Sequence, residues 1–76
     1  MVKKQIKLNT PNEVKEFVKA AEKCNFDIDI FYNRFKVDAK SFLGVASLDL
    51  SKILSVTYAG FNPDFETMLD RYAAIH

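Results

Sequence analysis

The sequence of 76 residues has no tryptophan, one cysteine (Cys24), one histidine (His76) and two glycines (Gly44 and Gly60). A single cysteine cannot close a disulfide within the chain, which is typical of proteins from a reducing compartment. Zinc sites need more cysteine and histidine ligands than this, so we expect no metal and no cofactor. Two isolated glycines also exclude a glycine-rich loop that cradles phosphate.

The sequence also lacks a strong excess of one charge and a long hydrophobic run. Eleven basic residues face ten acidic ones, whereas nucleic-acid-binding proteins are usually basic, so we expect no nucleic-acid partner. No apolar stretch approaches the roughly 20 residues that span a bilayer, and the N-terminus has no apolar signal core. We therefore expect a cytoplasmic protein without a membrane partner.

Hydrophobic residues make up 49% of the chain, including seven phenylalanines and three tyrosines. This content is enough for one packed layer of helices on a sheet, so residues 1–76 are expected to form a single domain. The sequence has no internal repeats, linkers or low-complexity segments.

The N-terminal part of the sequence predicts a strand followed by a helix. Residues 2–8 alternate, with Ile6 and Leu8 facing the core, and the lysines of this segment are typical of a solvated or edge strand. Thr10 is expected to cap the helix, with Pro11 in its first position and Glu13 completing a capping box. The helix is expected to run to about residue 24 with one apolar stripe, formed by Val14, Phe17, Val18 and Ala21.

Residues 26–32 and 35–39 alternate between apolar and polar side chains, which predicts a hairpin with its turn at Asn33 and Arg34. Residues 54–60 predict a further strand with Leu54, Val56 and Tyr58 on one face. The last helix is expected to be capped by Asn62, followed by Pro63, with Asp64 and Glu66 complementing its dipole. Its apolar stripe consists of Phe65, Met68, Leu69 and Tyr72.

Between these strands, residues 40–52 have the spacing of a short helix that begins at Ser41. Val45 and Leu48 share one side of it, and Phe42, Leu43 and Ala46 lie elsewhere around it. A short helix that is apolar on more than one side is either fully buried or presents an adhesive surface. The complete order is βαββαβα, and three apolar helical stripes pack most economically on one face of an antiparallel sheet.

The segment KSFLGVASLDLSK, residues 40–52, resembles the segment K-S-I-M-G-V-M-S-L-G of the HPr family. The preceding hairpin, the following strand and the last helix are in the same register, so the resemblance covers nearly the whole chain. It implies an α+β fold, the HPr-like open-faced β-sandwich, with a four-stranded antiparallel sheet and three helices on one face. HPr proteins are small cytosolic phosphocarriers of the bacterial sugar phosphotransferase system, which uses phosphoenolpyruvate.

The chain departs from the HPr pattern at the phosphoacceptor loop. The family carries G-x-H-A-R-P after its first strand, and the histidine accepts the phosphate. Here the shortened loop reads N-T-P-N-E-V, so Thr10 and Pro11 occupy the degenerate position and the only imidazole in the chain belongs to His76. We therefore expect a protein that is not an enzyme and does not carry phosphate as the family does.

The resemblance also assigns roles around the short helix. Ser41 matches a serine that a regulatory kinase phosphorylates in many HPr proteins, although a simple helix cap explains the residue as well. Phe42, Leu43 and Ala46, together with Lys40, match positions that contact partner proteins. The leading hypothesis is a protein-binding or regulatory module, and the alternatives are a divergent phosphocarrier and a repurposed binding or assembly module. The sequence predicts no oligomeric state.

Overall fold

The elements follow one another in the order that the sequence predicts. The computed structural model describes residues 1–74. The last helix lies within this range, and His76 lies outside the described residues. In chain order the elements are β1 (Val2–Ile6), α1 (Pro11–Glu22), β2 (Ile28–Tyr32), β3 (Phe35–Asp38), α2 (Phe42–Ala46), β4 (Leu54–Tyr58) and α3 (Pro63–Arg71).

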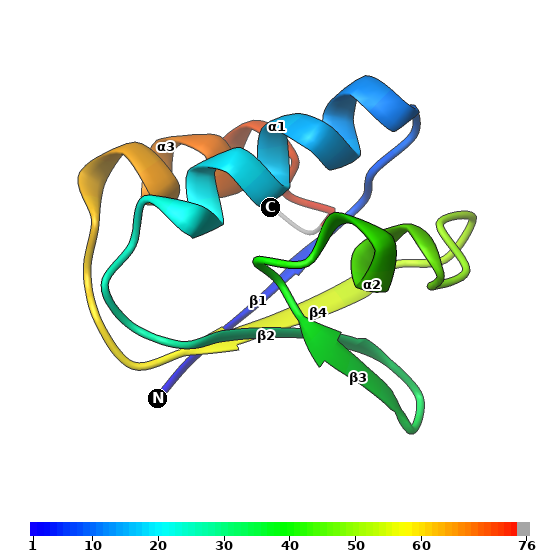
Figure 1. Cartoon of the computed structure of the whole chain (residues 1–76), viewed down its shortest axis with the longest axis horizontal. Helices are drawn as coiled ribbons and strands as arrows, with labels where there is room; N and C mark the ends of the chain where they lie inside the picture. The colour runs from blue at the N-terminus through cyan, green and yellow to red at the C-terminus, as the bar shows by residue number, and fades with distance from the viewer. Residues whose placement is uncertain (75–76) are drawn as a thin grey trace.

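The four strands form one antiparallel sheet with the order β1-β4-β2-β3, so that β4 lies between β1 and β2 although it is last in the chain. All three helices cover the same face of the sheet (Figure 1). This arrangement confirms the α+β class, the four-stranded antiparallel sheet and the single helical layer.

The core fills the space between the helices and the inner face of the sheet. The ring of Phe65 packs between those of Phe17 and Tyr58. The centroid distance is 6.1 Å from Phe65 to Phe17 and 5.3 Å from Phe65 to Tyr58. The apolar stripe of α1 is buried as expected, and so are the alternating residues of β2 and β4. In the expected stripe of α3, Phe65, Met68 and Leu69 are buried, whereas Tyr72 is the C-cap and only partly buried. Burial of these side chains is the main source of stability.

The strands are shorter than the alternation suggests, and β1 ends at Ile6. The backbone N–H of the next residue, Lys7, points to the outer edge of the sheet and donates to the carbonyl of Tyr72 at 3.0 Å. The N–H of Ala74 donates to the carbonyl of Gln5, also at 3.0 Å. The segment after α3 therefore lies along the outer edge of β1, while Leu8 is buried beyond the strand end.

The β2–β3 turn lies where the sequence places it. Asn33 has a φ of 56°, a left-handed conformation that asparagine tolerates better than most residues. Phe35 follows the turn and stays 65% exposed. The turn projects away from the three helices (Figure 1), so no helix covers that end of the hairpin.

Candidate functional site: the surface of the short helix

Helix α2 begins at the serine that the sequence predicts as its cap. Ser41 has an extended backbone, and its hydroxyl oxygen accepts a hydrogen bond from the N–H of Gly44 at 3.1 Å. The carbonyl of Ser41 accepts the N–H of Val45 at 3.0 Å, which closes the first turn. The cap is confirmed, and the exposed Ser41 side chain remains accessible to solvent.

The two apolar sides of α2 have different surroundings. Val45 and Leu48 are buried in the core, whereas Phe42 is 39% and Leu43 80% exposed, and Ala46 is exposed as well. Of the two possibilities that the sequence leaves open, full burial and an adhesive surface, the structure therefore has the exposed apolar surface. We call Phe42, Leu43 and Ala46 the α2 surface.

A groove separates the α2 surface from α1. It has a volume of about 320 Å³, and Phe42 forms its α2 wall, facing Lys15, Val18, Lys19 and Glu22. The exposed phenylalanine thus lies beside lysines as well as an apolar side chain. An incoming side chain can contact the ring and an ammonium group together.

Lys40 lies at the approach to α2 and is only half-buried. Its ammonium group donates to the carbonyl of Cys24 at 3.0 Å, just beyond the C-terminal end of α1, where a positive charge is favourable. This contact ties the entry of α2 to the end of α1. Lys40 thus helps to hold the α2 surface in place beside α1.

The position that the resemblance assigns to the phosphoacceptor loop, at the start of α1, is occupied by a helix cap. The hydroxyl oxygen of Thr10 accepts the N–H of Glu13 at 3.2 Å, and Pro11 takes the first helical position. The reciprocal half of the expected capping box differs, because the Glu13 carboxylate reaches past Thr10 and accepts the N–H of Asn9 at 2.8 Å. Only residues 7–9 connect β1 to this cap, which agrees with a shortened loop.

No imidazole or guanidinium group stands at this position within residues 1–74. The only histidine in the sequence is His76, outside the described part. Of the two arginines, Arg34 lies in the β2–β3 turn and Arg71 pairs with Glu16. The start of α1 therefore lacks the side chains that phosphohistidine chemistry uses.

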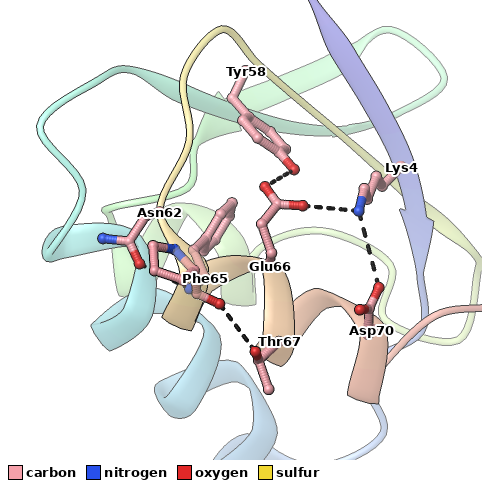
Figure 2. A network of polar contacts seen from close by, with 8 residues as sticks. Lys4, Tyr58, Asn62, Phe65, Glu66, Thr67 and Asp70 are labelled. Carbon is pink, nitrogen blue, oxygen red and sulfur yellow. Dashed lines mark hydrogen bonds and ion pairs between the residues drawn. The ribbon is translucent and has the colours of Figure 1, made fainter.

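The sequence analysis missed a network around Glu66 on α3. The Glu66 carboxylate accepts hydrogen bonds from the ammonium of Lys4 at 2.9 Å and from the hydroxyl of Tyr58 at 2.5 Å (Figure 2). It was expected only to complement the helix dipole, and Lys4 was expected to be solvated. The available signal was the alternation in β1, which puts Lys4 on the inner face with Ile6, where a charge needs a partner.

The pKa values of the network follow from these contacts. Burial raises the pKa of Glu66, but the hydrogen bonds donated by Tyr58 and Lys4 outweigh it, so the net shift is downward. Burial and the neighbouring carboxylate raise the pKa of Tyr58 far above its usual value. The hydrogen bond to Glu66 also raises the pKa of Lys4. Both shifts favour the charged forms, so Glu66 is held ionised beside a protonated Lys4.

Other candidate chemistry receives no support. Cys24 is buried, its thiol donates to the carbonyl of Ala20 at 3.5 Å, and burial raises its pKa, so it behaves as a small core residue. Within residues 1–74, no three His, Cys, Asp or Glu side chains are grouped closely enough to bind a metal ion. None of the described helices has the length and hydrophobicity to cross a membrane.

Among known proteins, the chain is similar to solved structures and not to any family model or curated sequence. No model of a known protein family matches the sequence, and no curated protein matches it. HPr-C-His from Thermoanaerobacter tengcongensis has a solved structure with a TM-score of 0.76 and 23% identity, over 93% of this chain and 89% of that one. The phosphocarrier protein HPr from Bacillus anthracis strain Ames gives a TM-score of 0.66 and 27% identity, over 96% and 93%.

These matches define the class of fold, which is an open-faced α+β sandwich with the order βαββαβα. The chain has the HPr-like fold. Because the likeness extends over nearly the full length of both solved proteins, the whole described chain, and not one part of it, shares their architecture.

Proposed function

We propose that this chain is a protein-binding or regulatory module related to the sugar phosphotransferase system, and that it neither carries phosphate nor acts as an enzyme. The observation that carries the proposal is the combination of an exposed α2 surface with a capped α1 that lacks an acceptor imidazole. Its likeness to the phosphocarrier protein HPr of Bacillus anthracis supports the relation to that system.

The chemistry of α1 argues against phosphate transfer. Phosphohistidine forms readily and reversibly, whereas the hydroxyl of Thr10 has a pKa far above neutral and is already engaged as the cap. Pro11 has no N–H to offer a phosphate, and the carboxylate of Glu13 repels one. A divergent phosphocarrier, the competing proposal, would need His76 as its acceptor.

The α2 surface has the features of a small docking site. Phe42 and Leu43 can supply the apolar anchors that dominate binding energy at interfaces, and the small Ala46 leaves room beside them. Phosphorylation of Ser41 would add nearly two negative charges next to these anchors. We expect this modification to alter partner binding, with Ser41 as the regulatory position.

The α2 surface is tested by replacing its anchor with a charge. A partner captured from extract of the native cells is expected to bind Phe42→Asp at least about tenfold more weakly, because a buried carboxylate would replace the anchor. The measurement is the dissociation constant of the purified pair by calorimetry.

Phe61→Asp is the matched control, because Phe61 is 74% exposed in the loop between β4 and α3. It is expected to retain the partner. Equal weakening in both variants, or no weakening in Phe42→Asp, would contradict the assignment of the α2 surface. The identity of the captured partner separates a role in the phosphotransferase system from a repurposed assembly role.

A further inference from the structure

A second groove lies between α1 and α3, and it shares Lys15 and Lys19 with the groove beside Phe42. Its volume is about 420 Å³, and it is lined on the α1 side by Lys15, Lys19 and Lys23 and on the α3 side by Asp64, Met68 and Arg71. This groove belongs neither to the α2 surface nor to the degenerate phosphoacceptor position. We call it the α1–α3 groove.

The charges of the α1–α3 groove are unbalanced. Lys15, Lys19 and Lys23 are exposed, and none of them forms an ion pair within residues 1–74. Glu16, which also lines the groove, is already paired with Arg71 and accepts the hydroxyl of Tyr72 at 2.9 Å. Three ammonium groups therefore face solvent along the groove with Asp64 as the remaining carboxylate.

The three lysines form one inclined row. Lys15 and Lys19 stand four residues apart in α1 and Lys23 is its C-cap, so each step rises about 6 Å along the helix axis and turns about 40° around it. Like charges four residues apart destabilise a helix by a few tenths of a kcal/mol, which the helix dipole offsets for Lys19 in the last turn and Lys23 at the C-cap but not for Lys15 in the middle of α1. Ala20 and Met68 add an apolar floor beside it.

We infer that the α1–α3 groove binds an acidic helix of a partner protein, with carboxylates at every fourth position facing Lys15, Lys19 and Lys23. A partner helix has the same four-residue repeat as the row and can rest on Ala20 and Met68, as helices do in other grooves. This surface shares Lys15 and Lys19 with the groove beside Phe42, whereas Lys23 and the α3 residues Asp64 and Met68 belong to the α1–α3 groove and not to that one.

The acidic residues of the groove decide between a helix and other polyanions. A nucleic-acid strand or an anionic membrane presents negative charge without interruption and would be repelled by Asp64 and by any exposed oxygen of Glu16. A helix carries its carboxylates in one stripe and can place a basic or neutral side chain opposite Asp64. The mixed lining therefore favours a protein partner.

An alanine-rich helical peptide with glutamate at every fourth position is the probe, and a peptide of the same composition with the glutamates scattered around the helix is its control. Titration of the isotope-labelled full chain, followed by NMR amide shifts, is expected to move residues of α1 and α3 with the first peptide. Binding is expected to weaken as salt is raised, because exposed ion pairs are screened.

The double variant Lys19→Gln/Lys23→Gln is expected to bind the peptide about tenfold more weakly, through the loss of two exposed ion pairs. Lys52→Gln, an exposed lysine in the loop before β4, is the matched control and is expected to bind as the parent does. The inference is overturned by shifts confined to the α2 surface or absent altogether, by equal binding of the scattered peptide, or by an unchanged double variant. Tighter binding of an oligonucleotide or of anionic vesicles at the same residues would also overturn it.

Discussion

Replacing Gly60 with alanine is expected to destabilise the protein by about 1–3 kcal/mol, the usual cost of overpacking. A Cβ atom at this position would overlap Cδ1 of the Phe26 ring and lie 2.6 Å from its Cγ. That ring is itself stacked on Tyr58 at a centroid distance of 5.9 Å, so moving it disturbs this contact. For a domain of this size, each kcal/mol lowers the midpoint of thermal unfolding by roughly 4–8 °C.

Gly44→Ala is the matched control for this experiment. A Cβ atom there would lie 3.2 Å from Oγ of Ser41 and 3.4 Å from Cβ of Val37, and alanine favours the helical conformation of α2. Its stability is expected to stay within about 0.5 kcal/mol of the parent, since the two effects oppose each other. A Gly60→Ala variant as stable as Gly44→Ala would show that Phe26 does not close on Gly60.

Replacing Glu66 with alanine is expected to cost about 1–3 kcal/mol, because it leaves the hydroxyl of the buried Tyr58 without its acceptor, whereas Lys4, with 35% of its side chain exposed, can bind water. Glu66→Gln is expected to cost less, because an amide can still bond to both groups but loses the charge. Chemical unfolding in urea measures both changes. Asp70→Asn is the control, because Asp70 is 3.9 Å from the Lys4 ammonium and its side chain is 78% exposed, so the loss is expected to be below about 0.5 kcal/mol.

The Glu66 network also predicts a pH dependence. The pKa of Glu66 in the folded protein is lower than its usual value of 4.5, so its contribution to stability is fully present above pH 4.5. That contribution is lost as the pH falls through the folded pKa. Unfolding free energies measured between pH 6 and about pH 3 are expected to fall more steeply for the parent than for Glu66→Gln. Identical slopes would mean that Glu66 is not held ionised by Lys4 and Tyr58.

The features that the sequence predicts well are local ones. A cap needs only a side-chain oxygen two or three residues before the N–H that it accepts, so Thr10, Ser41 and Asn62 could be recognised from their immediate neighbours. The helical stripes and strand alternation depend on repeats of similar range. For the apolar residues of α2, the sequence allowed either full burial or exposure. The pattern of residues does not tell which side of a short helix packs against another element.

The features that the sequence could not predict depend on contacts between distant segments. Glu66 meets Lys4 across 62 positions of the chain, and Lys40 meets the Cys24 carbonyl across 16. The placement of β4 between β1 and β2 likewise depends on how the whole sheet packs. The α1–α3 groove joins two helices from opposite ends of the chain, so a lysine row that reads as a solvated face becomes one wall of a concave surface.

The central claim is that the missing loop, and not only the missing histidine, separates this chain from a phosphocarrier. The direct measurement is incubation with phosphoenolpyruvate and the general phosphotransferase enzyme, followed by a count of acid-labile phosphate on the parent chain, on Thr10→His and on a deletion of His76. We expect no acid-labile phosphate on any of them, because an imidazole at position 10 would cap α1 and not lie over its free amides. Phosphate on the parent that disappears with His76 would establish a divergent carrier, and transferable phosphate on Thr10→His would show that the residue alone was lacking.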